Sequence, residues 1–540
     1  MRRQTTEETP CRLARTALLL ASFALLSRFL GLARDMVMAW LVGNSMAADA
    51  LVAAMRLPHL IRRMLGEGSL SMTLTASLVH LTRSQTFEQP QEHTPLLARA
   101  LAIRLGLVLG AITLVGLLTA PWLATFLAPG FASAGQDMVV TLLRICLPYI
   151  LAAGMAALCM ALLHTSGIFW LPALSPCLFN LVILALAAVA VVGLLPPVIA
   201  LALGMLCGGL VQWLAQWLAV RRLLGMYSPR QTEAKVTSNI GSIAWRCLSR
   251  LPTGLVGAAA PQLAMLAAMT LASGLGTGRV AALYYAERLL ELPLGLVGVC
   301  LGTASLPTLS RLAAERNYEL FASHLATALR LALLFSLPAT AGLWAVGPQL
   351  IQGLLGRGAF DATAARETAL ALSAYVCGLP ALAVNRCLLA ACNAMGRAKN
   401  TAIGAVWAVA ATITTGIILL HTWPGQIAGP ALAVSMGMLV QSLFLLRVLA
   451  DAGKPGELRI SFCLPRGSVV LRQAVAAVAA GICAHLLLQI TMPHLWSKLL
   501  LAIAGGFLAW FLCLLLFGDA DIHAVFRRVR RAVSGQIRRA

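Results

Sequence analysis

Charged side chains inside long apolar stretches are the residues of this chain best placed to do chemistry, because a charge is costly in an apolar helix and usually marks a site. Arg28 and Asp35 are seven residues apart and so lie on one face of a helix, with Arg34 about a third of a turn away. Arginine suits bidentate binding of phosphate. Arg28 and Arg34 are therefore candidate anion-binding residues, and a packing ion pair between Arg28 and Asp35 is the alternative.

A charged stripe follows in the next apolar segment. Asp49, Arg56 and Arg63 repeat at intervals of seven, Arg62 flanks them, and Glu67 lies one turn further on. Such a stripe cannot face lipid along its whole length. It predicts a water-filled cavity in which the carboxylates moderate the repulsion between arginines. For the far end of the stripe, a place at the membrane interface is the alternative.

A second charged cluster lies in the segment 284–291. Glu287 and Glu291 are four residues apart on one helical face, with Arg288 about 100° round the helix. Because the two clusters open the two halves of the chain, we expect one cavity shared between the halves. An arginine-rich cleft inside an apolar shell suits an amphiphile with an anionic head and an apolar tail.

The elements that carry these residues are predicted to be transmembrane helices. Of 540 residues, 60% are hydrophobic and 11% are charged, whereas globular domains have about a quarter charged. Apolar runs long enough to cross a bilayer recur throughout, without the alternating segments of a β-barrel. We predict an all-α integral membrane protein with fourteen spans, at residues 14–42, 46–81, 96–125, 136–166, 169–193, 196–221, 241–272, 280–308, 323–351, 364–392, 400–421, 425–450, 469–491 and 496–517.

The distribution of basic residues supports this count. The net charge is +22, which in a soluble protein would suggest nucleic acid. Here the basic side chains gather in every second short loop, and an excess of basic residues is typical of cytoplasmic loops. We therefore predict both termini on the cytoplasmic side and no nucleic-acid partner. Four basic residues break the rule by lying in predicted outer loops: Arg279, Arg357, Arg366 and Lys498.

The spans are expected to form two six-helix lobes around a central cavity, followed by two extra helices. A faint repeat supports two lobes: the segments 127–167 and 356–396 resemble each other at an offset of 229 residues, with Phe131 matching Phe360 and a glycine closing each. The predicted parts are a first lobe at 1–225, a basic cytoplasmic linker at 226–240, a second lobe at 241–450, the last two helices at 451–518 and a basic cytoplasmic tail at 519–540.

The sequence carries no motif for catalysis or for a metal. It has no Ser-His-Asp or Cys-His set, HExxH motif or P-loop, and its 13 cysteines are scattered without ligand spacing. We expect no enzyme activity, no cofactor and no metal site. Beyond Glu291, no acidic residue lies deep in a predicted span of the second lobe. We therefore expect no dedicated sodium site there, and the membrane potential as the driving force.

Several ordered motifs resemble those of the MurJ/MviN family, the lipid II flippases of bacterial peptidoglycan synthesis, within the multidrug/oligosaccharidyl-lipid/polysaccharide exporter superfamily. The likeness covers most of the chain. It is strongest in the stretches 27–35, 48–71, 128–131, 171–176 with Asn180, and 284–293.

The resemblance implies an alternating-access cycle that moves lipid II, the undecaprenyl-pyrophosphate-linked disaccharide-pentapeptide, to the outer leaflet of the bacterial inner membrane. Lipid II and membrane lipids are the implied partners, and cell-wall synthesis proteins are further candidates. The resemblance also implies substrate-binding roles for Arg28, Arg34, Asp49, Arg62 and Arg288. The second-rank candidates are Arg63, Glu287 and Glu291, joined by Arg56 from the charged stripe.

The chain also departs from the family pattern. Glu287 stands where the family usually has Asp, and His59 where it usually has Asn. The stretch 73–77 lacks the usual proline, and 396–402 replaces a late Asp-Thr-x-Thr-Pro motif. These departures bear more on the gating of the second lobe than on the head-group site of the first.

Three other functions compete with lipid II transport. An exporter of another polyprenyl-phosphate-linked glycan would use the same kind of cavity. A drug/cation antiporter of the same superfamily should line its cavity with acidic and aromatic side chains, and a scaffold that recruits cell-wall enzymes would not need buried charge. The arginines argue against these last two.

Overall fold

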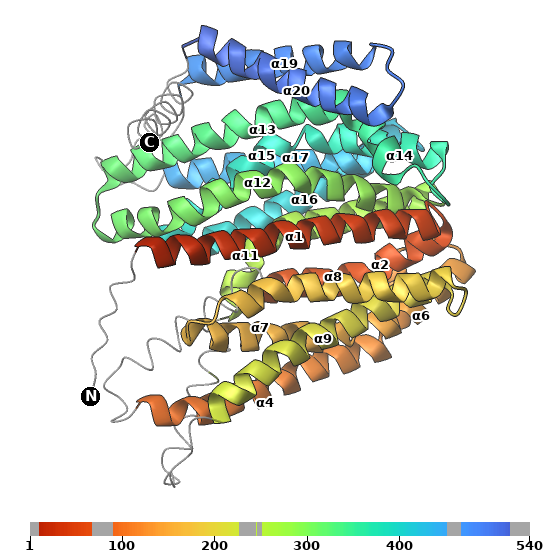
Figure 1. Ribbon diagram of the computed structural model, residues 1–540, viewed down its shortest axis with the longest axis vertical. Helices are drawn as coiled ribbons and strands as arrows, with labels where there is room; N and C mark the ends of the chain where they lie inside the picture. Colours follow the sequence, from red (N-terminus) through yellow and green to blue (C-terminus); the bar gives the residue numbers. More distant parts are fainter. Residues whose placement is uncertain (1–9, 67–89, 226–244, 246–250, 451–465, 519–540) are drawn as a thin grey trace, which may run out of the picture. The chain divides into compact units, whose positions relative to one another are not determined.

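The computed structural model describes residues 10–66, 90–225, 245, 251–450 and 466–518. In these ranges the chain forms α-helices joined by short turns, and no strand occurs among them (Figure 1). Nine described helical stretches are long and apolar enough to cross a membrane, and a bent pair of helices adds a tenth. The predicted all-α membrane fold is confirmed.

The predicted number of fourteen spans stays a prediction. The described helices α1 (Pro10–Val42), α2 (Met46–Gly66), α11 (Leu251–Ala272) and α12 (Arg279–Ala314) coincide with four predicted spans but are not among the nine. Three of them, α1, α2 and α12, carry the charged side chains on which the site hypothesis depends. Hydropathy and length are weak criteria for such helices, since functional charge lowers their hydropathy.

The chain divides into two compact units. Unit 1 comprises residues 1–259 with 276–278, and unit 2 comprises 260–275 with 279–540. The predicted linker at 226–240 and the predicted tail at 519–540 lie outside the described residues, so the proposed division of the chain stays a prediction.

Unit 1 contains a helical bundle centred on Tyr149. Its helices are α1, α2, α4 (Pro90–Leu118), α5 (Ala120–Leu127), α6 (Ser133–Cys146), α7 (Tyr149–Thr165), α8 (Trp170–Val191) and α9 (Pro197–Gly225). The Tyr149 ring is fully buried, lies 5.5 Å from the Phe179 ring of α8 and meets His59 of α2 edge-on at 6.5 Å. A Cβ at Gly209 of α9 would overlap this ring. Four helices therefore pack closely around one aromatic side chain.

Unit 2 contains η1 (Ser273–Leu275), α12 and seven further described helices. These are α13 (Tyr318–Leu355), α14 (Ala362–Val376), α15 (Leu379–Ala394), α16 (Ala398–Thr422), α17 (Ala428–Ala450), α19 (Gly467–Leu488) and α20 (Leu495–Leu516). The last two lie against α13 (Figure 1), where Leu334 packs with Ala476, Ala480, Trp510 and Leu514.

A buried polar network ties α15 to α17 in unit 2. The Asn385 Nδ2 donates to Gln441 Oε1 at 3.2 Å, and Ser442 Oγ donates to Asn385 Oδ1 at 3.0 Å. All three side chains are buried. Hydrogen bonds between helices replace water as the partner of these groups, which lipid cannot provide.

Two long spans are interrupted near their middle. The predicted span 136–166 is observed as α6 and α7, separated at Leu147 and Pro148, and 364–392 is observed as α14 and α15, which are bent by 46°. Prolines at or just after these breaks, Pro148 and Pro380, cannot donate the helical hydrogen bond. The predicted span 364–392 is therefore observed as a bent pair of helices that together are long and apolar enough for one span. The span expected at 96–125 also ends earlier, at Leu118, and α5 follows it.

The interrupted spans match the faint repeat closely. They begin at Ser133 and Ala362 and end at Thr165 and Ala394, 229 residues apart in both cases. Gly167 and Gly396 follow with φ of 76° and 72°, a left-handed conformation that glycine adopts without strain. The repeat inferred from a few sequence matches is thus present in the secondary structure.

A buried carboxylate anchors the turn before α12 within unit 1. Asp49 is 0% exposed, and its Oδ2 accepts a hydrogen bond of 2.6 Å from the backbone N–H of Gly278. Gly278 has φ of 85°, and a Cβ there would overlap the carbonyl oxygen of Asn44. Close approach of the two backbones therefore requires glycine at this position.

We predict that Gly278→Ala destabilises the protein more than Gly276→Ala. Both residues have a left-handed φ, but a Cβ at Gly276 would meet nothing within 4 Å. Both variants should lose about 1–2 kcal/mol from backbone strain, and Gly278→Ala should lose about a further 1–3 kcal/mol from overlap. Thermal unfolding of the purified protein in detergent compares the two. Equal melting temperatures would show that the turn is not held as described.

Candidate functional site

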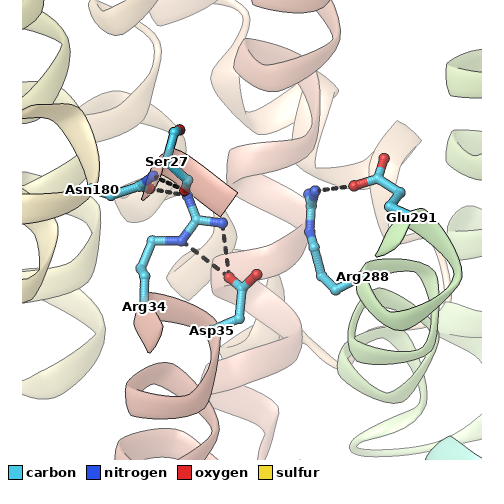
Figure 2. Close-up of polar contacts among 6 residues, drawn as sticks. All are labelled: Ser27, Arg34, Asp35, Asn180, Arg288 and Glu291. Atoms are coloured by element: carbon cyan, nitrogen blue, oxygen red, sulfur yellow. Dashed lines mark hydrogen bonds and ion pairs between the residues drawn. The ribbon is translucent and has the colours of Figure 1, made fainter. Parts of the chain in front are cut away.

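Arg34 is held by two polar side chains inside unit 1. Its Nε and Nη2 both donate to Asp35 Oδ1, at 3.0 and 2.8 Å, and its Nη1 donates to Asn180 Oδ1 at 3.1 Å (Figure 2). Asn180 also donates from Nδ2 to the backbone oxygen of Ser27 at 3.2 Å. One amide of α8 therefore binds α1 at two places and fixes the guanidinium between them.

The structure adds a partner that the pattern of helical faces did not indicate. Asp35 bonds to Arg34, its neighbour in the chain. The side chains of Arg34 and Asp35 are 14% and 7% exposed. Arg34 is thus an oriented, partly desolvated cation, while Arg28 lies partly buried on the same helix.

The charged stripe of α2 does not face water along its length. Asp49 and Arg56 are 0% and 4% exposed, and Arg62 and Arg63 are partly buried. The expectation of a water-lined stripe was wrong at its first two members, because Asp49 is committed to the Gly278 amide. Glu67 lies outside the described residues.

The candidate site of unit 2 is built on α12. Arg288 Nη1 donates to Glu291 Oε2 at 2.8 Å (Figure 2). The guanidinium also lies 4.7 Å from the centre of the Tyr284 ring. The side chains of Arg288 and Glu291 are 17% and 28% exposed, whereas Glu287 is buried. A carboxylate and an aromatic face thus orient this arginine within one helix.

The aromatic residues beside Arg288 connect it to the segment just before α14. The Tyr284 and Tyr285 rings meet edge-on at 5.6 Å, and the Tyr285 ring meets Phe360 edge-on at 5.4 Å. Phe360 lies just before α14 and is the residue that the repeat matched to Phe131. The position of α12 is therefore coupled by packing to the start of α14.

Arg386 is a charged residue that the sequence analysis missed. It lies within α15, is exposed, and its Nη1 donates to the backbone oxygen of Leu294 at 3.1 Å. Leu294 is three residues after Glu291, so Arg386 lies near the Arg288–Glu291 pair along α12. The sequence does carry a signal for it, an isolated charge in an apolar span. A search for clusters of charge does not detect a single charged residue.

These groups can bind anions but are not arranged as a catalytic set. Arg34 and Arg288 are each oriented by a carboxylate and one further side chain, a state that lowers the entropic cost of binding phosphate. Within the described ranges, no group of three or more His, Cys, Asp or Glu side chains could hold a metal ion. The two clusters lie in different units, and their convergence on one substrate stays a prediction.

The chain was compared with known proteins. The family model described as lipid II flippase MurJ matches residues 38–508. A lipid II flippase MurJ from Burkholderia cenocepacia is 30% identical over 470 residues, which cover 85% of this chain and 89% of the relative.

Solved structures support the same fold. A lipid II flippase MurJ in an inward closed conformation has a TM-score of 0.74 at 22% identity and covers 93% of this chain and 98% of its own. An inward-facing multidrug resistance transporter of the MATE family, in the MOP superfamily, has a TM-score of 0.65 at 17% identity, covering 82% of this chain and 100% of its own. At these identities the structures establish the fold alone. The family model and the Burkholderia relative establish more: this chain belongs to the lipid II flippase MurJ family.

Proposed function

We propose that this protein carries lipid II from the inner to the outer leaflet of the bacterial cytoplasmic membrane. Membership of the family supports the substrate. The observation that carries the proposal is the way Arg34 is held by Asp35 and Asn180, an oriented arginine inside a membrane protein. For packing alone, an apolar side chain would serve at a lower desolvation cost. The presence of an arginine therefore favours a binding role.

The chemistry follows from the diphosphate of the cargo. Arginine donates in a planar fork that matches phosphate oxygens and stays charged at any physiological pH. We propose that Arg28, Arg34, Asp49, Arg62 and Arg288 form the head-group site, with Arg56, Arg63, Glu287 and Glu291 in support. In this scheme the diphosphate displaces Glu291 from Arg288, so that one anion replaces another and the arginine is not left bare.

Asp49 has a separate part in this proposal. Because its carboxylate holds the Gly278 amide, it contributes by fixing the turn before α12, the helix that carries Arg288. We propose this positioning role in addition to the place of Asp49 in the head-group site.

We propose the inner membrane as the location, with both termini on the cytoplasmic side. The family supports a membrane location, and the positive-inside pattern supports the orientation. Contact with cell-wall synthesis proteins remains a candidate interaction for the cytoplasmic segments.

Another function deserves comparison because the fold is shared with multidrug transporters. A carrier of cationic drugs would need acidic and aromatic side chains in place of oriented arginines. An exporter of another polyprenyl-diphosphate-linked glycan would use the same arginines, and transport of the purified lipids separates it from a lipid II flippase.

We predict that Arg28→Ala, Arg34→Ala and Arg288→Ala each abolish transport while the protein still inserts. Loss of a charged hydrogen bond to the cargo costs about 1.5–3 kcal/mol, which is tenfold or more. Lysine replacements should restore only part of the activity, because lysine lacks the bidentate fork. The measurement is rescue of cells depleted of their own lipid II flippase, with Arg316→Ala in an exposed turn as control. Normal growth of the alanine variants at normal expression would refute the site.

We predict a smaller loss for Arg386→Gln. Arg386 lies beside the α12 site but bonds to a backbone oxygen instead of a carboxylate. Removal of its charge should lower the transport rate several-fold through weaker attraction of the anionic head, at unchanged expression. Transport in vesicles at low and high salt is the test, since an electrostatic contribution should shrink as salt rises. A rate equal to that of the unchanged protein at low salt would exclude Arg386 from the site.

We predict that transport follows the membrane potential and does not need sodium. Outward movement of an anion is favoured by an inside-negative potential, by about 2.3 kcal/mol per charge per 100 mV. Transport is measured first with choline replacing sodium, then with the potential collapsed by valinomycin and potassium. Loss of activity without sodium at constant potential, or full activity at zero potential, would contradict the prediction.

A further inference from the structure

A cavity in unit 2 lies apart from the candidate transport residues. It has a volume of about 720 Å³ and lies between the last turns of α13, the loop 356–361 and the first turns of α14. Its lining includes Arg357, Asp361 and Arg366 together with Pro348, Ala369 and Leu370. Its size falls in the range of small-molecule sites, about 300–1,000 Å³.

The polar end of this cavity carries one net positive charge. Arg357 and Arg366 are exposed, and across the described part of the chain neither makes an ion pair within 4.0 Å. Asp361 is engaged as the N-cap of α14, where its Oδ1 accepts a 2.7 Å hydrogen bond from the Ala364 N–H. The nearby Glu367 is neutralised by Arg279 at 3.1 Å. Two guanidinium groups and one carboxylate therefore suit an anion with a single charge.

The rest of the cavity is apolar and follows α14. Lining residues from Ala362 to Ser373 recur on one face of the helix, a distance of about 16 Å at the rise of an α-helix. Ala369 and Leu370 lie on this face beyond Arg366, and the Leu370 side chain is 43% exposed. The cavity thus has a cationic end in the loop and an apolar end along a membrane-spanning helix.

The arginines of this cavity also conflict with the topology. Arg357 and Arg366 are two of the four basic residues in predicted outer loops, which otherwise carry almost no positive charge. Topogenesis disfavours such placement. A binding function that requires cationic side chains at the outer surface would account for these two arginines.

We propose that this cavity binds an anionic phospholipid of the outer leaflet. Its singly charged phosphodiester lies between Arg357 and Arg366, and one acyl chain lies along Ala369 and Leu370. The single charge of a phosphodiester matches the net charge of the polar end, whereas a diphosphate would bring more charge than the cavity neutralises. The site is separate from the proposed transport site, so its existence does not depend on which lipid is transported.

Site-specific cross-linking tests the proposal, because a chain of net charge +22 attracts anionic lipids at many places. The photoreactive residue p-benzoylphenylalanine replaces Leu370 in one protein and Leu439 of α17 in another. These positions are similarly exposed, at 43% and 42%. Each full-length protein is reconstituted in vesicles of equal phosphatidylglycerol and phosphatidylcholine, illuminated, and the lipid attached to the labelled peptide is identified by mass.

At Leu370 we expect phosphatidylglycerol adducts to exceed phosphatidylcholine adducts at least fivefold, and at Leu439 we expect nearly equal amounts. Arg357→Gln with Arg366→Gln should reduce the Leu370 ratio to that at Leu439, and each single variant should reduce it in part. Lys498→Gln removes another predicted outer charge from unit 2 and should leave the ratio unchanged.

Equal adducts of the two lipids at Leu370 would overturn the proposal, and so would an undiminished ratio in the double variant. A small amount of undecaprenyl diphosphate is also added to the vesicles. If its adduct then replaced the phosphatidylglycerol adduct, the cavity would be assigned to a diphosphate lipid and the proposal would be overturned. Loss of the ratio on addition of inorganic phosphate would show a site for free anions instead of a lipid.

Discussion

A charge placed among membrane helices has to be given a partner by the protein, because lipid offers none. Three of the described charges obey that constraint with partners from the same helix, another helix or a turn. Arg34 uses its sequence neighbour Asp35 and the amide of Asn180, Arg288 uses Glu291 and the face of Tyr284, and Asp49 uses a backbone N–H. Each solution also fixes a helix, so the same contacts that make the charges tolerable position them for a ligand.

The interrupted spans also affect how side chains are positioned, here over whole helices. The pair α6–α7 and the pair α14–α15 begin and end at matching places in the two units, and each is followed by a left-handed glycine. A break in a helix frees backbone groups and lets side chains at the two ends point differently. Both units therefore contain the same helix–break–helix segment. In unit 2, Phe360 just before α14 packs on Tyr285, close to Arg288 in the sequence of α12.

The sequence predicted what depends on composition and periodicity, namely the all-α membrane fold and the repeat, while the roles of Arg34 and Arg288 stay a prediction. It did not predict hydrogen-bond partners that leave no periodic pattern in the sequence. The Arg34–Asp35 contact joins adjacent residues, which a helical-face argument treats as divergent, and the Gly278 amide that binds Asp49 has no side chain to signal it. The bend between α14 and α15 falls beside Pro380, a signal that the hydropathy pattern does not use. The place of Arg386 depends on tertiary packing, which single-sequence patterns do not contain.

The two arginines illustrate a requirement that any carrier must meet. A site that binds its anion too tightly would not release it, because the free energy gained on binding must be supplied again on release. Glu291 reduces that gain at Arg288, because an arriving phosphate exchanges with a carboxylate and does not meet a bare cation. At Arg34 the carboxylate of Asp35 has the same effect, because it accepts from Nε and Nη2, while the neutral amide of Asn180 orients Nη1. Each arginine is therefore already paired with a carboxylate, so that an arriving phosphate gains only the difference between two anionic partners and can leave again.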